Sequence, residues 1–119
     1  MSEIKALVFD VFGTVVDWRT SLIDNFTAWA ARKGIKGDWT ALVDGWRAAY
    51  MPSMDEVRKR PESEFVILDD LQRQSIEPLT AKLGITGLTS ADFDYLTKGW
   101  HSLNPWPDSV SGLTRLKTK

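Results

Sequence analysis

The amino-terminal segment reads IKALVFDVFGTVVD over residues 4–17 and joins a short apolar run to an abrupt polar end. Residues 4–9 alternate poorly between apolar and polar types, which is typical of a strand buried on both faces of a parallel sheet. Asp10 follows at the carboxyl end of this strand, where open α/β sheets place their ligands. Residues 10–17 then read as a loop or tight hairpin, with Gly13 supplying backbone freedom. The segment therefore predicts an α/β fold with a carboxylate at the edge of a sheet.

Beyond this segment the sequence follows a helical pattern. Gly34 and Gly84, each followed by isoleucine, are predicted to end the first and third helices. Asp38 is the predicted N-cap of the second helix. Pro52 is expected to kink or end that helix, with Ser53 starting a further short one. Apolar side chains at helical spacing predict the helices themselves, over residues 22–30, 39–50, 65–83, 93–100 and 110–116.

The predicted strand at residues 4–9 has no partner elsewhere in the sequence. A lone buried strand would leave its backbone N–H and C=O groups unpaired, which is costly. The sequence stops at Lys119, after a predicted amphipathic helix, where a strand–helix–strand unit would supply its second strand. We therefore expect these 119 residues to be the front half of a larger protein.

Composition and charge narrow the class of protein. Fifteen basic and sixteen acidic side chains give a net charge of −1, so neither a nucleic acid nor a membrane is an expected partner. The absence of cysteine excludes disulfides, thiol nucleophiles and cysteine-ligated zinc, and a single histidine excludes a histidine-rich metal site. The apolar stretch at residues 6–9 is too short for a signal peptide or a membrane span. The cytoplasm is the expected location.

Asp10 is the candidate reactive group. A carboxylate in this position can act as a nucleophile that forms an ester with the substrate, which water then cleaves. The loop after it offers free backbone N–H groups and the Thr14 hydroxyl. An aspartate after a strand also commonly caps a turn, and the residues alone leave both interpretations open.

The pattern Asp-x-x-Gly-Thr-Val-x-Asp at residues 10–17 resembles the first motif of the haloacid dehalogenase superfamily. Trp46-Arg47, the linker LNPWPDS at residues 103–109 and the closing GLxxLK at residues 112–117 resemble its (S)-2-haloacid dehalogenase branch, known as type II. The resemblance covers essentially the whole chain. It implies a Rossmann-like α/β core, of which only the first strand is present, with an inserted helical cap domain. Residues 1–14 and 101–119 would belong to the core and residues 15–100 to the cap.

Phe12 bears on which chemistry of the superfamily applies. Phosphatases of the superfamily usually carry a second aspartate at this position as the general acid for the leaving alkoxide. Phe12 cannot transfer a proton, and a halide ion leaves without one, so a dehalogenase can dispense with the acid. The branch usually carries tyrosine there. Packing beneath the loop is an equally open role for the ring.

The resemblance implies hydrolytic dehalogenation of short 2-haloalkanoic acids to 2-hydroxy acids through an ester on Asp10. The backbone N–H of Val11 would help to hold the substrate carboxylate, and Thr14 would hydrogen-bond near the nucleophile. Arg47 would stabilise the departing halide, although from the residues alone it could equally be a surface residue whose stem covers a tryptophan. An apolar wall would complete the site, formed by Phe12, Met51 and Phe65.

The remaining aromatic and polar residues have simpler interpretations. Trp18 and Trp106 lie off the helical stripes and could pack at the hinge between cap and core. His101 is expected to be solvated, and Asp92 and Asp94 to lie on a solvated helix face. The other tryptophans follow the stripes and are expected in the core: Trp29, Trp39, Trp46 and Trp100.

The later motifs of the superfamily, a serine or threonine, a lysine and an acidic region, have no counterpart in these residues. We therefore expect the 119-residue chain alone to be inactive. The branch needs no metal or other cofactor, only the haloacid and water, and its members are commonly homodimers. Two alternatives stay open: a magnesium-dependent phosphoryl or phosphonyl hydrolase of the same superfamily, and a non-catalytic fragment that associates with a partner chain.

Overall fold

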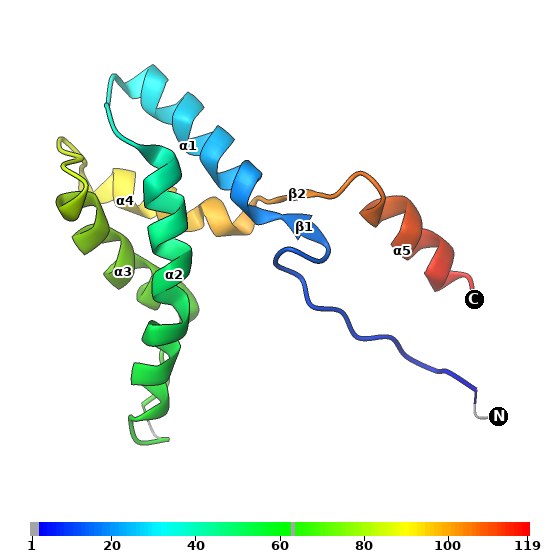
Figure 1. The fold of residues 1–119 in the computed structure, drawn as a ribbon. Helices are drawn as coiled ribbons and strands as arrows, with labels where there is room; N and C mark the ends of the chain where they lie inside the picture. Colours follow the sequence, from blue (N-terminus) through cyan, green and yellow to red (C-terminus); the bar gives the residue numbers. More distant parts are fainter. Residues whose placement is uncertain (1–2, 63) are drawn as a thin grey trace.

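The computed structural model describes residues 3–62 and 64–119, and this part of the chain is largely helical (Figure 1). Helices α1 to α4 gather on one side, while α5 and the extended amino-terminal segment lie on the other. The elements are β1 (Val16–Asp17), α1 (Trp18–Lys33), α2 (Trp39–Arg58), α3 (Leu68–Lys82), α4 (Ser90–Thr97), the short 3₁₀ helix η1 (Lys98–His101), β2 (Asn104–Pro105) and α5 (Ser109–Lys117).

Helices α1 to α4 and η1, called here the helical bundle, enclose the apolar core. Phe26 of α1, Trp46 of α2 and Ile76 of α3 are all fully buried. The Trp46 indole N–H donates to the backbone oxygen of Gln72 at 3.0 Å, which ties α2 to α3 without leaving a buried donor unpaired. Gly99 lets η1 approach α1 closely, because a Cβ there would lie 2.9 Å from the Phe26 ring. The core is thus built from elements that follow one another in the chain.

The predicted helix ends are confirmed by their backbone and side-chain geometry. Gly34 and Gly84 adopt φ angles of 72° and 68° just beyond α1 and α3, a conformation that glycine accepts without strain. The Asp38 side chain accepts a hydrogen bond from a backbone N–H of α2. Thr89 and Asp92 form a reciprocal capping box at the start of α4.

The boundaries of α2 and α3 differ from the prediction. Helix α2 continues through Pro52 to its end, so the expected break and restart at Ser53 is wrong. Pro52 has no backbone N–H to donate within the helix. The hydroxyl of the next residue, Ser53, donates to the carbonyl oxygen of Ala49 at 2.7 Å and adds a hydrogen bond at this point. Helix α3 begins at Leu68 rather than at Phe65, with two acidic residues in its first turn that suit the positive end of the helix dipole.

The strand predicted at residues 4–9 is not formed in the described chain: the segment is extended and pairs with no other described residue. Its predicted burial is wrong for the described chain, because nothing covers its faces: Val8 is 97% exposed and Ile4 78% exposed. Helix α5 likewise buries none of its residues. Residues 3–15 and α5 are together called the outer region below.

Strands β1 and β2 join the bundle to the outer region (Figure 1). They pair antiparallel, with Val16 opposite Pro105 and Asp17 opposite Asn104. Asp17 also caps α1, since its carboxylate accepts the backbone N–H of Thr20 at 3.1 Å. Among the described residues, no helix has the length and apolar character needed to cross a membrane.

Candidate active site

The loop after the extended segment folds into a compact turn around Asp10. The Thr14 hydroxyl donates to Oδ2 of Asp10 at 2.9 Å. The carbonyl oxygen of Val11 accepts the backbone N–H of Val15 at 2.9 Å, which closes the turn. Gly13 sits within it at a φ of 92°, where a side chain would be strained. The predicted pairing of Asp10 with Thr14 is therefore present, with the carboxylate open to solvent.

Arg47 lies half-buried on α2 with its charge unpaired. Its guanidinium carbon is 4.9 Å from the centre of the Tyr50 ring and 5.7 Å from that of Trp18. It forms no ion pair or hydrogen bond with any residue in the ranges 3–62 and 64–119. Contact with two ring faces orients the guanidinium while leaving its five N–H donors available. Such a group can bind an anion.

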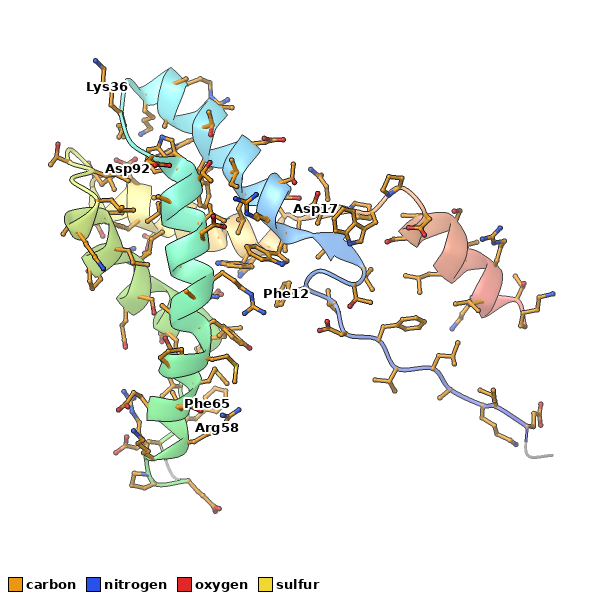
Figure 2. All side chains as sticks on the ribbon, in the orientation of Figure 1. Phe12, Asp17, Lys36, Arg58, Phe65 and Asp92 are labelled. Carbon is orange, nitrogen blue, oxygen red and sulfur yellow. The ribbon has the colours of Figure 1, made fainter. Side chains whose placement is uncertain are left out.

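An aromatic bridge formed by Phe12, Trp18 and Trp100 connects this arginine with the loop. Trp18 stacks on Trp100 with ring centres 5.9 Å apart, and the edge-on contact between Phe12 and Trp100 spans 5.5 Å. The indole Nε1 of Trp100 is buried without a hydrogen-bond partner in the described chain. Figure 2 shows Phe12 in the turn between the bundle and the extended segment. Phe12 thus contacts Trp100 while Arg47 lies over Trp18, so the two residues approach different members of one stacked pair.

The other two residues predicted for the apolar wall are exposed side chains. Met51 on α2 is 52% exposed, and Phe65 is 88% exposed in the connection before α3. Figure 2 shows Phe65 well away from Phe12. The structure therefore does not bring Phe65 to the turn, and its role in an apolar wall stays a prediction.

The structure adds neighbours of Arg47 that the sequence reasoning missed. Tyr50 lies three residues after Arg47 on α2, so helical spacing alone could have indicated the contact. Trp18 and Trp100 come from the start of α1 and from η1, and only the folded bundle brings them together. Trp18 contacts Arg47 directly, and Trp100 stacks on Trp18 behind it.

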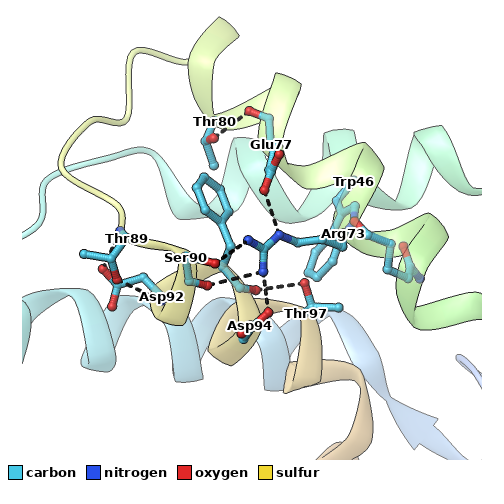
Figure 3. Close-up of polar contacts among 11 residues, drawn as sticks. Trp46, Arg73, Glu77, Thr80, Thr89, Ser90, Asp92, Asp94 and Thr97 are labelled. Carbon is cyan, nitrogen blue, oxygen red and sulfur yellow. Dashed lines mark hydrogen bonds and ion pairs between the residues drawn. The ribbon is translucent and has the colours of Figure 1, made fainter.

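The acidic residues of α4 have a structural role (Figure 3). Asp92 is only 4% exposed, so its predicted placement on a solvated face is wrong. Its pKa is lowered, first by the hydrogen bond from the Thr89 backbone and then by the ammonium of Lys33, which lies 3.0 Å away. Asp94 pairs with Arg73 of α3 and is exposed as predicted. No group of three metal-binding side chains forms in the described ranges.

His101 is solvated as predicted. Its Nε2 lies 2.9 Å from a carboxylate oxygen of Asp69, and both side chains are about half exposed. The pair links η1 to α3 at the surface. It belongs neither to the turn around Asp10 nor to the group of rings beside Arg47.

Comparison with solved structures relates the chain to L-2-haloacid dehalogenases. A defluorinating L-2-haloacid dehalogenase is 45% identical with a TM-score of 0.81, over 92% of this chain and 45% of that chain. Another L-2-haloacid dehalogenase is 40% identical with a TM-score of 0.85, over 98% of this chain and 48% of that chain. The L-2-haloacid dehalogenase from Xanthobacter autotrophicus, 20% identical with a TM-score of 0.70 over 97% and 43% of the two chains, shares the fold.

The chain thus spans about half the length of these neighbours. Neither a protein-family model nor a curated protein matches it. The overlaps confirm the predicted fold class, which is a helical cap joined to part of an α/β core.

Proposed function

Because the chain belongs to the haloacid dehalogenase superfamily, in its L-2-haloacid dehalogenase branch, we propose that the protein hydrolyses short 2-haloalkanoic acids to 2-hydroxy acids and halide. The observation that carries this proposal is the unpaired, half-buried charge of Arg47, which meets the turn of Asp10 through one aromatic bridge. A carboxylate nucleophile and a free cation beside aromatic surface are the groups that displacement of a halide needs.

In the first step, Asp10 attacks C2 of the haloacid in line with the carbon–halogen bond. The Thr14 hydroxyl holds Oδ2, and no described side chain donates to Oδ1, which leaves that oxygen free to attack. An electron pair of Oδ1 forms the C–O bond as the halide departs with the bonding pair, so the configuration at C2 inverts. Water then attacks the carbonyl carbon of the ester, which releases the hydroxy acid and one proton and restores Asp10.

Two further groups would handle the charges of the substrate. Arg47 would stabilise the departing halide, and the low polarity of the Trp18 and Tyr50 rings would strengthen its field. The backbone N–H of Val11, which bonds to no described residue, would donate to the substrate carboxylate. Phe12 would add apolar surface and, lacking an ionisable group, fits a leaving group that needs no proton.

The reaction as proposed needs only haloacid and water, with no metal or cofactor. A cytoplasmic location and a homodimeric state remain parts of the proposal that rest on composition and on the resemblance. We also expect residues 1–119 expressed alone to release no halide, because their extended segment lies uncovered.

The test is a halide-release assay on the protein expressed from its complete natural coding sequence, after its intact mass has been measured. Release from 2-chloro- and 2-bromoalkanoic acids should disappear in Asp10→Asn and persist in Asp24→Asn, an exposed aspartate on α1 that serves as the matched control. In water labelled with heavy oxygen, a single turnover should place the label in the Asp10 carboxylate and not in the product.

Three outcomes would contradict the proposal. Full activity of Asp10→Asn would show that Asp10 is not the nucleophile. Activity on phosphoryl or phosphonyl substrates that depends on added magnesium and is inhibited by vanadate would favour the magnesium-dependent hydrolase. Absence of any turnover in the verified natural protein would favour a non-catalytic role in association with another chain.

A further inference from the structure

The linker that follows η1 is hydrogen-bonded to the turn that carries Asp10. The indole Nε1–H of Trp106 donates to the carbonyl oxygen of Gly13 at 3.0 Å. The backbone N–H of Trp106 donates to the carbonyl oxygen of Val15 at 3.1 Å, and the Ser109 hydroxyl donates to the same oxygen at 2.6 Å. Three donors from the linker region therefore meet two carbonyl groups of one turn.

These two carbonyl groups lie on either side of Thr14, whose hydroxyl holds Oδ2 of Asp10. A shift of the peptide units at Gly13 or Val15 would therefore carry Thr14 with it. The backbone hydrogen bonds within the turn join residues 11–16 to one another, so they do not by themselves fix the turn relative to the rest of the molecule. The bonds from the linker, together with the contact of Phe12 with Trp100, fix its position.

The linker is suited to act as a rigid support. Trp106 lies between Pro105 and Pro107, whose rings fix their φ angles and restrict the residues that precede them. Pro105 also pairs with Val16 where β1 and β2 run antiparallel. Trp106 is 37% exposed and lies outside the apolar core, while its indole N–H is bonded to Gly13.

We propose that Trp106 is a positioning residue, which holds the turn through Gly13 and thereby aims the Asp10 carboxylate at the substrate. This inference rests on the proposed dehalogenation for its catalytic consequence, but the mechanical link to the turn stands apart from it. Trp106 does not touch the reacting atoms, and its effect passes through Gly13 and Thr14.

The experiment uses Trp106→Phe in the protein expressed from its complete natural coding sequence, because phenylalanine keeps a ring and removes only the indole donor. Ser109→Ala removes a second bond to the turn and serves as an independent variant. Trp29→Phe makes the same ring change within the bundle, next to Tyr95 and distant in sequence from the linker, and is the matched control. Hydrogen exchange of the amides at residues 13–16 reports on the turn directly.

We expect those amides to exchange about tenfold faster in Trp106→Phe, as the loss of one hydrogen bond predicts, while amides of α1 to α4 are unchanged. In the halide-release assay we expect kcat to fall about tenfold or more with KM altered less than about twofold, because a misaimed nucleophile slows chemistry rather than binding. Ser109→Ala should shift both measurements in the same direction, and Trp29→Phe neither.

Unchanged exchange of the turn in both Trp106→Phe and Ser109→Ala would overturn the inference. A fall in kcat no larger than that of Trp29→Phe would overturn it as well, because a general loss of packing would then explain the effect. If the unsubstituted protein releases no halide, the proposed function fails together with this catalytic consequence. The exchange measurement would still decide whether Trp106 holds the turn.

Discussion

The helical bundle and the outer region contain similar apolar residue types but place them in opposite environments. Phe26 and Ile76 of the bundle are fully buried, whereas Val8 and Val110 of the outer region are 97% and 66% exposed. The bundle buries its apolar faces because α1 to α4 follow one another closely and cover each other. The comparison shows that folding energy within this chain comes from the bundle, while the candidate nucleophile lies in a region that contributes little of it.

The largest expected effect tests the bundle side of this comparison. Phe26→Ala should destabilise the 119-residue chain by about 3–5 kcal/mol, since it opens a cavity in a fully buried position. Phe9→Ala, at a site that is 43% exposed in the outer region, should cost less than about 0.5 kcal/mol. Both values are measured by chemical denaturation. Equal losses would mean that the two regions share one cooperative core.

A second expected effect concerns the place where the two regions meet. Arg47→Ala should slow single-turnover halide release by the native protein by about 10²-fold, because the departing anion loses its counter-charge. Arg47→Lys should recover only part of the rate, since a lysine keeps the charge but not the planar group that lies against Trp18 and Tyr50.

Arg32→Ala, on the exposed last turn of α1, is the control for a general loss of positive charge. An unchanged single-turnover rate in Arg47→Ala would remove the role in halide departure that we assign to this residue. The turn of Asp10 would then have to act without support from the bundle.

Local signals made much of the bundle predictable. Gly34 and Asp38 mark helix ends through their own backbone and side-chain preferences, and neither signal depends on distant contacts. The motif at residues 10–17 likewise indicated the hydrogen bond between Thr14 and Asp10, because both partners lie in one turn. Short-range contacts of this kind can be predicted because both partners lie close together in the sequence.

Features that depend on tertiary contacts could not be predicted in the same way. The burial of Asp92 depends on Lys33, which lies 59 residues earlier in the sequence. The aromatic bridge needs α1, η1 and the turn to meet, and nothing near Trp100 in the sequence indicates Phe12 as its neighbour. The contact of Trp106 with Gly13 spans 93 residues, so the off-stripe position of Trp106 suggested a hinge without naming its partner.

A smaller expected effect is that the ion pairs of the two regions contribute differently to stability as the pH changes. Asp92 in the bundle has a lowered pKa, so its ionised form stabilises the fold at neutral pH, and this contribution is lost as the pH falls through the pKa of the folded state. The stability advantage of the unsubstituted chain over Asp92→Asn should therefore be full near neutral pH and shrink below the unfolded value of 3.8.

The matched control is Glu3→Gln, because the pair of Glu3 with Lys5 in the outer region spans 4.0 Å between side chains that are each 83% exposed. Its substitution should leave the denaturation midpoint unchanged at neutral and at acid pH. An advantage of Asp92 that persists undiminished in acid would show that its capping geometry, and not its charge, stabilises α4.

The smallest expected effect is the most direct test of the outer region. In the 119-residue chain, Val8→Ala should change stability by less than about 0.5 kcal/mol, since the side chain is 97% exposed.

The extended segment and α5 nevertheless border an apolar groove of about 880 Å³, lined by Ile4, Lys5, Ala6, Leu7, Phe9, Leu113, Leu116, Lys117 and Lys119. The structural neighbours are about twice as long as this chain, so we expect Val8 to be covered in the protein made from the complete natural coding sequence. There the same substitution should cost about 2 kcal/mol, because it removes two buried methyl groups and leaves a cavity. A cost near zero in both proteins would show that the exposure of the outer region is a property of the protein rather than of these residues taken alone.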